Sequence, residues 1–443
     1  MIKNVVKRSG AIVPFNPERI TNAIYRAAVA VGGRDRTTAE GLTGQVVQFL
    51  EGQTLPDHTP TVEEIQDVVE KVLIENGHAK VAKAYILYRD ERSRLRRFRS
   101  NRIITSEYIP WAKIYQVLDW AVEHGVHTVA GLNERIHRGE FGDIVHESDK
   151  AYREDLESAA EMILALRKKL RMIIITGPSS SGKTTSTIKI GMRLKHHGLN
   201  LVTLNVDNYF FDLELHPRDE FGDYDFETPQ ALDLGLIDQH LGRLIAGEEV
   251  LIPFYDFKTG KRFNNHTPIK IGPNDLILID SLHGLYPEMT LSIPNEQKYK
   301  VYLEPLLQMK SPDGEYVRWS DLRLIRRMLR DAVHRAYNPR RTLEHWHYVR
   351  ASEMHNIIPR IQEADFIVNT GMPYELPIYA ARMLGQFAQW EQDYTGQPLR
   401  EDSYERARRV HGLLRLVTPV KDDSVIPPDS VLREFIGGSC YEY

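Results

Sequence analysis

Residues 177–185 (GPSSSGKTT) have the spacing G-x-x-x-x-G-K-[ST] of a phosphate-binding loop. The two glycines allow backbone N–H groups to curl around a phosphate. The ammonium of Lys183, which we interpret as a catalytic group, reaches the β- and γ-phosphates of a nucleotide. The hydroxyl of Thr184 stands where Mg²⁺ is held. The residues that we expect to contact ATP are Gly177, Ser179, Ser180, Ser181, Gly182, Lys183, Thr184 and Thr185.

The residues on both sides of this loop favour that interpretation over a Gly/Ser-rich surface turn. Residues 172–176 (MIIIT) are an apolar run, as expected of a buried strand. The pattern from Thr184 to Gly198 is typical of a helix. A strand, a glycine-rich loop and a helix in this order place a phosphate at the helix N-terminus.

Two aspartates stand at the ends of predicted strands. Asp280 ends the apolar segment 276–280 (LILID), where a carboxylate can support Mg²⁺. Asp207 follows the strand 201–206, and the carboxyl ends of strands face the ligand crevice in open α/β sheets. We interpret Asp207 as the general base for a substrate hydroxyl. The alternatives are an ordinary strand-end aspartate for Asp280 and a turn aspartate that caps Asn208 for Asp207.

Four arginines crowd one face of a predicted helix in residues 321–331 (DLRLIRRMLRD). They fall at positions i, i+3, i+4 and i+7, and they are Arg323, Arg326, Arg327 and Arg330. Like charges at this spacing repel one another, and an anionic partner would relieve the repulsion. We expect that partner to be ATP phosphate beneath a lid formed by this helix, with Arg326 and Arg327 acting on the transferred group. Salt bridges to Asp321 and Asp331 are a partial alternative.

The predicted elements divide the chain into three parts. Residues 1–95 contain short strands and helices, residues 96–170 form a mostly helical linker, and residues 171–443 alternate strands with helices. Such alternation predicts an α/β fold of the P-loop NTPase type, with a mainly parallel sheet and flanking helices. The predicted strands are 172–176, 201–206, 276–280, 299–304 and 365–370. The linker carries an apolar stripe that should pack on the next domain: Leu156, Ala160, Ile163, Leu166 and Leu170.

Composition limits the class of protein. The chain has 443 residues, is 42% hydrophobic and carries a net charge of −4, as expected of a globular enzyme without a nucleic-acid partner. The single cysteine excludes an internal disulfide framework and favours a reducing compartment. A signal peptide and an apolar run of membrane-spanning length are both missing. We therefore expect a cytoplasmic protein without a membrane partner, in which the basic run 90–102 is a solvated helix end.

Two segments near the N-terminus resemble the ATP-cone, a small, mostly helical regulatory domain that binds nucleotides. They are VVKRSGAIVPFNPERI and PTVEEIQDVVEKVLIENGHAKVAKAYILYR, and together they span nearly all of residues 1–95. The resemblance implies that Lys7 and Arg8 contact nucleotide phosphates. Arg19 stands where a lysine is common in that family, and we include it in the regulatory site.

Six later segments follow the order found in the uridine kinase / phosphoribulokinase family. They are GPSSSGKTT, VDNYF, DFETPQALD, IPFYDFKTGKR, LILID and DLRLIRRMLRD. The resemblance implies ATP-dependent phosphorylation of a sugar hydroxyl, with Asp207 as catalytic acid/base and the arginine helix as lid. It places Tyr209, Glu227, Tyr255 and Phe257 at the acceptor. Residues 426–439 also resemble the ending of bacterial uridine-kinase-like proteins that carry an extra N-terminal domain.

Two positions depart from uridine kinases. That family holds the ribose hydroxyls with an aspartate in a motif F-D-x-P, and Glu227 stands at the matching position. The family also carries a histidine shortly after Y-D-F that helps to read the pyrimidine base, and Gly260 takes its place here. A glycine side chain cannot supply that contact.

Three functions follow as hypotheses. The first is a Mg²⁺- and ATP-dependent kinase that acts on a nucleoside or a related ribose-containing acceptor. The second is a kinase for a sugar or sugar phosphate, which the absence of the base-reading histidine keeps open. The paired nucleotide-binding units allow the third, a regulatory protein that senses nucleotides without turnover. Uridine kinases are commonly oligomeric, so we expect a homo-oligomer whose assembly ATP or dATP at the N-terminal domain could shift.

Overall fold

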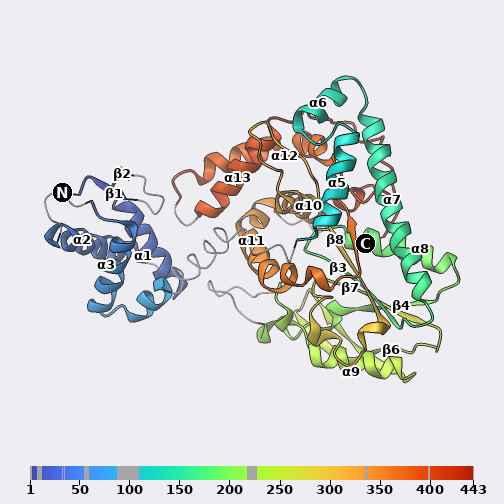
Figure 1. Ribbon diagram of the computed structural model, residues 1–443. Helices are drawn as coiled ribbons and strands as arrows, with labels where there is room; N and C mark the ends of the chain where they lie inside the picture. The colour runs from blue at the N-terminus through green and yellow to red at the C-terminus, as the bar shows by residue number, and fades with distance from the viewer. Residues whose placement is uncertain are drawn as a thin grey trace. The chain divides into compact units, whose positions relative to one another are not determined.

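In a computed structural model, the described residues form two compact units, one within residues 2–86 and one within residues 109–442 (Figure 1). The residues that the structure describes are 2–6, 12–31, 33, 35–53, 59–86, 109–216, 227–334, 338–397 and 400–442. Each unit has its own hydrophobic core. Within these ranges no helix is long and apolar enough to cross a membrane.

The N-terminal unit is mostly helical. Its elements are β1 (Asn4–Val6), β2 (Ile12–Pro14), α1 (Glu18–Ala30), α2 (Arg36–Gln53) and α3 (Val62–Glu75), followed by helical residues 79–86. The two strands pair antiparallel. The start of α3 is fixed by a capping box. The N–H of Glu64 donates to Oγ1 of Thr61 at 3.2 Å, and the N–H of Thr61 donates to the Glu64 carboxylate at 2.7 Å.

Five parallel strands form the sheet of the second unit, in the order β4-β7-β3-β8-β9. They are β3 (Met172–Thr176), β4 (Leu201–Asn205), β7 (Leu276–Ser281), β8 (Lys298–Glu304) and β9 (Phe366–Asn369). Every residue of β3 is buried, because a central strand of a parallel sheet is covered on both faces. The predicted strands and the mainly parallel α/β fold are confirmed.

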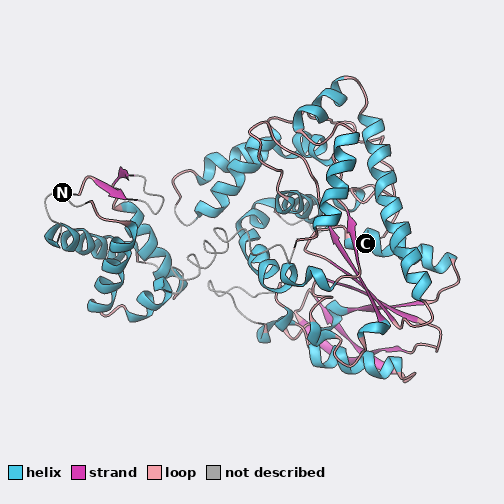
Figure 2. Ribbon diagram, viewed as in Figure 1, coloured by secondary structure: helices cyan, strands magenta, loops and turns pink. Residues whose placement is uncertain are grey.

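Helices flank this sheet, and two hydrophobic cores share the side chains of β3 (Figure 2). Ile173 and Ile175 belong to the larger core, whereas Met172 and Ile174 belong to the smaller one, because successive side chains of a strand point to opposite faces. The helices are α5 (Trp111–Glu123), α6 (Val129–His137), α7 (Phe141–Leu166), α8 (Lys183–His196), α9 (Leu234–Ile245), α10 (Trp319–His334), α11 (Pro339–Ser352), α12 (Glu375–Tyr394), α13 (Glu401–Leu414) and α14 (Arg433–Ile436).

The described part of the expected linker, residues 109–170, is packed into the second unit. Helices α5, α6 and α7 contribute side chains to the same core as β3. In the predicted apolar stripe, Leu156, Ala160, Ile163 and Leu170 are buried, whereas Leu166 is 39% exposed. This segment is therefore a structural layer of the unit that carries the phosphate loop.

A two-stranded hairpin that we did not predict projects from the same unit. β5 (Val250–Asp256) pairs antiparallel with β6 (Lys261–Ile269). Gly260 lies in the turn with φ of +67°, a conformation that glycine adopts readily. The hairpin contains the motif Y-D-F, so it brings predicted acceptor residues toward the end of β4.

Candidate active site

The phosphate loop joins the end of β3 to the start of α8, so it lies at the carboxyl edge of the sheet. Geometry requires both of its glycines. A Cβ added to Gly177 would lie 2.2 Å from the carbonyl oxygen of Leu303, and Gly182 has φ of +86° at the N-cap of α8. The chain therefore turns sharply into α8, whose first N–H groups are suited to bind an anion.

Lys183 lies at the first position of α8 and folds back over the loop. Its ammonium donates to the carbonyl oxygens of Gly177 at 3.0 Å and Pro178 at 3.2 Å. Burial lowers the pKa of Lys183, while the nearby carboxylates of Asp280 and Glu434 act in the opposite direction. The loop thus holds a buried cation next to its own backbone.

Buried hydroxyl groups in the loop indicate what it can hold. The hydroxyl oxygens of Ser180 and Ser181 have no hydrogen-bond partner among the described residues. Ser180 also has φ of +59°, which is uncommon for a residue with a side chain. Unsatisfied hydroxyl groups, a cation and a helix N-terminus fit a nucleotide phosphate, which would supply the missing acceptors.

Asp280 and Asp207 lie near Lys183 at the same edge of the sheet. Asn205 of β4 pairs with Asp280 of β7, and Asp207 follows β4 in the short helix η2 (Val206–Tyr209). Burial raises the pKa of Asp280 to about 6; Asp207 contributes to this rise, and Lys183 opposes it. Asp207 itself is exposed, so an acceptor hydroxyl could reach it. The structure brings these three predicted residues together.

Oxygen ligands for Mg²⁺ are present beside the loop. Thr184 offers a hydroxyl in the first turn of α8, and Asp280 offers a carboxylate. Among the described residues no group of three or more His, Cys, Asp or Glu side chains could hold a metal ion. Mg²⁺ usually binds one or two protein oxygens together with phosphates and water. The two donors therefore fit an ion that arrives with a nucleotide.

Helix α10 is not the open lid that its sequence suggests. The side chains of Arg323 and Arg326 are fully buried and pair with protein carboxylates. Those carboxylates belong to Glu304, Glu353 and Glu375. Internal acids thus relieve the crowding of positive charge for which we expected ATP to be the partner. Direct contact of these two arginines with ATP is contradicted by their burial.

Arg323 and Arg326 instead support the phosphate loop through hydrogen bonds to its backbone. The guanidinium of Arg323 donates to the carbonyl oxygen of Ser179 at 3.2 Å, and that of Arg326 donates to the carbonyl oxygen of Ser180 at 3.4 Å. Each arginine therefore joins a buried carboxylate to the loop backbone. We classify both as positioning residues.

Breaking one buried pair should destabilise the fold strongly. Arg326→Met leaves the buried carboxylate of Glu375 without its cation, and such a loss typically costs about 3–5 kcal/mol. Chemical denaturation at neutral pH measures the change, with Arg408→Met on the exposed face of α13 as the control. Arg326→Met/Glu375→Gln removes both charges and should regain part of the loss. A single variant as stable as the parent would contradict a structural role for the pair.

Arg327 connects the loop to the predicted acceptor carboxylate. Its guanidinium donates to Oγ of Ser179 at 3.1 Å and to Oε1 of Glu227 at 2.7 Å. Burial tends to raise the pKa of Glu227, but Arg327 outweighs it and holds the pKa below its usual value. Arg330 lies close enough to Lys183 to lower the pKa of that ammonium. These two arginines stay near the loop and can still act on phosphate.

Two residues predicted to bind the acceptor lie in the smaller core. Tyr209 has no exposed surface, and its hydroxyl bonds to Nδ1 of His240 at 3.0 Å. Tyr255 is 3% exposed and packs against Phe210 and Phe257. Their burial contradicts direct contact with the acceptor. Phe257, on the hairpin, is 63% exposed and remains accessible.

Geometry as well as sequence excludes a side chain at position 260. A Cβ added to Gly260 would lie 2.8 Å from Cβ of Leu213, and the Leu213 N–H donates to the Gly260 carbonyl oxygen at 2.8 Å. The hairpin turn is therefore packed against the short helix η3 (Leu213–Leu215). A base-reading histidine at this position would require the two segments to separate.

A buried histidine that we did not predict lies beside the site. His283 is 3% exposed, and neither ring nitrogen has a hydrogen-bond partner of ordinary geometry among the described residues. Burial lowers the pKa of His283 to about 4, although Glu227 favours the charged ring. Its place three residues after Asp280 is the sequence signal that could have identified it.

The pKa of His283 predicts a measurable pH effect on stability. Because the folded state disfavours the charged ring, stability should fall as the pH drops from 6.5 toward 4, by roughly 2 kcal/mol at pH 5. His283→Gln should flatten this part of a denaturation profile, whereas His266→Gln, at an exposed position, should not. If both variants keep the slope of the parent, the ring of His283 does not titrate as proposed.

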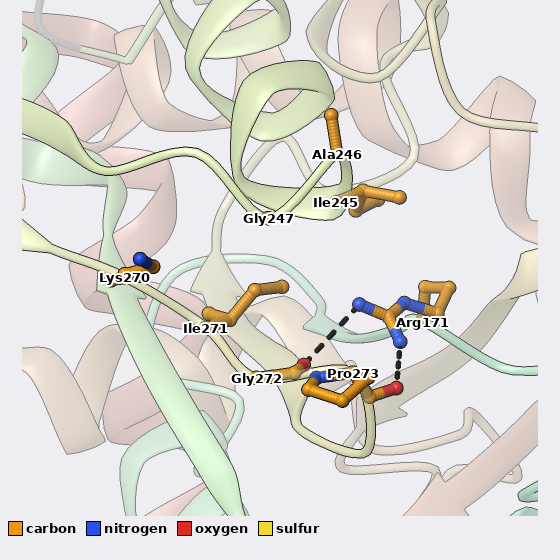
Figure 3. Close-up of a pocket in the computed structure, with 8 residues that line it drawn as sticks. All are labelled: Arg171, Ile245, Ala246, Gly247, Lys270, Ile271, Gly272 and Pro273. Carbon is orange, nitrogen blue, oxygen red and sulfur yellow. Dashed lines mark hydrogen bonds between the residues drawn. The ribbon is translucent and has the colours of Figure 1, made fainter.

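A pocket at the other edge of the sheet is not part of this site (Figure 3). It is lined by Arg171, Ile245, Ala246, Gly247, Lys270, Ile271, Gly272 and Pro273. Arg171 immediately precedes β3, at the end of the strand opposite the phosphate loop. Its guanidinium donates to the carbonyl oxygens of Gly272 and Pro273, as the dashed lines show. This arginine is therefore engaged in holding a loop.

The predicted regulatory residues are only partly visible. Lys7 and Arg8 lie outside the described residues. Arg19 lies in the first turn of α1, and its side chain is exposed. A role of these residues in nucleotide binding stays a prediction.

A phosphate loop, two strand-end aspartates and a parallel sheet define the class of P-loop kinases. The family model for the Phosphoribulokinase / Uridine kinase family matches residues 172–376, and the model for the ATP cone domain matches residues 3–94. The chain belongs to the phosphoribulokinase / uridine kinase family and carries an N-terminal ATP-cone domain.

Individual relatives match one unit each. A uridine kinase from Anoxybacillus flavithermus is 30% identical over 208 residues, which are 46% of this chain and 89% of that protein. Uridine-cytidine kinase B from Dictyostelium discoideum is 27% identical over 201 residues, 45% of this chain and 74% of the relative. The vitamin B12-dependent ribonucleoside-diphosphate reductase of Thermoplasma acidophilum is 46% identical over 101 residues. That match covers 22% of this chain and only 13% of the reductase.

Proposed function

We propose that this chain is an ATP- and Mg²⁺-dependent kinase that phosphorylates a hydroxyl of a nucleoside or a related ribose-containing acceptor. The observation that supports this most is that Lys183, at the start of α8, lies at the sheet edge where the neighbouring strands β4 and β7 bring Asp207 and Asp280 together. A phosphate loop alone would suit ATPases, GTPases and kinases alike. An exposed carboxylate beside it suits transfer to a hydroxyl.

The residues divide the work as follows. The loop N–H groups and Lys183 bind the phosphates, and Arg327 and Arg330 supply further positive charge. Thr184 and Asp280 would hold Mg²⁺, and Mg²⁺–ATP would supply the phosphoryl group, with ADP as the leaving group. Asp207 receives the proton of the acceptor hydroxyl.

Glu227 gives the acceptor side its proposed anchor. Arg327 binds one of its carboxylate oxygens, and the pair fixes the carboxylate next to the phosphate loop. A carboxylate held in this way can accept hydrogen bonds from a ribose diol. Relatives named uridine kinase support a nucleoside as the acceptor. The closed turn at Gly260 instead favours the second candidate function, a sugar or sugar-phosphate kinase.

A substrate panel separates these possibilities. The purified chain is incubated with Mg²⁺–ATP and single acceptors: uridine, cytidine, adenosine, ribose and ribulose 5-phosphate. We expect release of ADP to rise with a nucleoside, and EDTA to abolish the rise. A response only to the sugars would select the second candidate. The absence of ADP release with every acceptor would favour the nucleotide sensor.

We also propose that the N-terminal unit regulates this activity. ATP or dATP bound through Lys7, Arg8 and Arg19 would shift a homo-oligomer and thereby the rate. Lys7→Ala/Arg8→Ala should remove the effect of added dATP on sedimentation and on kcat, whereas Lys71→Ala on α3 should not. A dATP response that survives in the double variant would contradict this regulation.

A further inference from the structure

A carboxylate from far along the chain occupies the start of α8. The N–H of Thr185 donates to Oε2 of Glu434 at 3.1 Å, and the hydroxyl of Thr185 donates to the same oxygen at 2.8 Å. Glu434 is 3% exposed, and Thr185 is completely buried. The two residues are 249 positions apart in the sequence.

These donors are groups that a nucleotide would use. The first N–H groups of a helix have no partner within the helix, and in a phosphate loop they bind phosphate oxygens. Thr185 is the third residue of α8, whereas the next N–H, that of Ser186, already bonds to the carbonyl oxygen of Gly182. An oxygen of Glu434 therefore stands where a phosphate oxygen would accept the same hydrogen bond.

The segment that carries Glu434, residues 426–438, is fixed by contacts to the loop, to α8 and to the residue that precedes α12. We refer to it as the C-terminal tail. Asp429 pairs with Lys189 of α8 at 2.8 Å, and Ser430 bonds to the hydroxyl of Tyr374 at 2.7 Å. Val431 packs so tightly that a Cβ added to Gly182 would lie 2.6 Å from its Cγ2 atom.

Charge also opposes the simultaneous presence of Glu434 and a nucleotide. The carboxylate of Glu434 lies close enough to Asp280 to raise the pKa of that side chain, and both carboxylates favour the charged form of Lys183. A triphosphate brings further negative charge to the same few donors. Both anions cannot accept from Thr185 at once.

We propose that Glu434 is an internal competitor of the nucleotide: its carboxylate mimics a phosphate oxygen at Thr185, and nucleotide binding displaces it together with the C-terminal tail. The proposal rests on the proposed function, because the displaced contact lies in the ATP site. The C-terminal tail thereby sets the nucleotide affinity of the kinase domain.

Calorimetric titration of the full chain with Mg²⁺–ADP tests this competition. Glu434→Gln keeps the size of the side chain but removes its charge, and hydrogen bonds to charged groups are about twice as strong as neutral ones. We expect Glu434→Gln to bind Mg²⁺–ADP about tenfold more tightly than the parent. The matched control is Glu405→Gln, at an exposed position on α13, which should leave the affinity unchanged.

Hydrogen exchange gives a second measurement that does not depend on a variant. Addition of Mg²⁺–ADP to the parent should speed exchange at amides of residues 426–438, and Lys183→Met should abolish that response. An unchanged or weaker affinity of a folded Glu434→Gln, or slower exchange in the C-terminal tail, would overturn the competition while leaving the kinase proposal intact. If neither the parent nor Glu434→Gln binds Mg²⁺–ADP, both proposals fail.

Discussion

Lys183→Met should lower kcat with Mg²⁺–ATP and the best acceptor by about 100- to 1,000-fold or more. Loss of a single preorganised donor to a developing negative charge has effects of this size in other enzymes, and here the donor is a full cation. Methionine preserves the length of the side chain and its packing over Gly177 and Pro178. The variant should therefore fold but lack the cation that binds the phosphates.

Steady-state kinetics and Mg²⁺–ADP titration measure this effect. Lys195→Met, on the exposed side of the same helix, is the matched control and should behave as the parent. A fall of less than about tenfold would show that Lys183 is not the phosphate ligand. An equal fall in both variants would indicate that damage to α8 is responsible.

Asp207→Asn should reduce kcat by about 100- to 10,000-fold while leaving Mg²⁺–ADP affinity near that of the parent. A positioned general base contributes this much, and asparagine cannot accept the proton of an acceptor hydroxyl. Asp207 is exposed and makes its backbone contact through the N–H, which donates to Oδ1 of Asn205 at 3.0 Å. The substitution should therefore leave the fold of β4 and η2 intact.

The comparison of rate and affinity distinguishes a kinase from a nucleotide sensor. Asp119→Asn, at an exposed position on α5, provides a control for the loss of one negative charge. If Asp207→Asn keeps the full rate of turnover, another group must act as the general base. A loss of nucleotide affinity equal to the loss of rate would make Asp207 part of the donor site.

The sequence predicted where the phosphate loop and the two aspartates lie in the fold, because the signals for them are local. The loop lies within nine residues, and its glycines are required by the backbone between β3 and α8. Asp280 lies near the end of the apolar strand β7, Asp207 follows β4, and these parallel strands end at the same edge of the sheet. Short-range patterns therefore carried enough information to place Lys183, Asp280 and Asp207 together.

The same reasoning failed for Arg323 and Arg326, whose partners come from elsewhere in the chain. Glu304 ends β8, Glu353 follows α11 and Glu375 begins α12. No spacing rule connects these acids to α10, so a helix face with four arginines looked like a site for an external anion. Burial of Tyr209 and Tyr255 escaped prediction for a similar reason, because they pack in the smaller core with residues from distant parts of the chain, including the hairpin and α9.

The contact between Thr185 and Glu434 also has a consequence in time. The ribosome adds about 5–20 residues per second, so Glu434 is synthesised roughly 12 to 50 seconds after the phosphate loop. During that interval a nascent chain exposes Thr185 without its internal carboxylate. Under the proposed competition, a nucleotide therefore meets no rival at Thr185 until Glu434 has been synthesised.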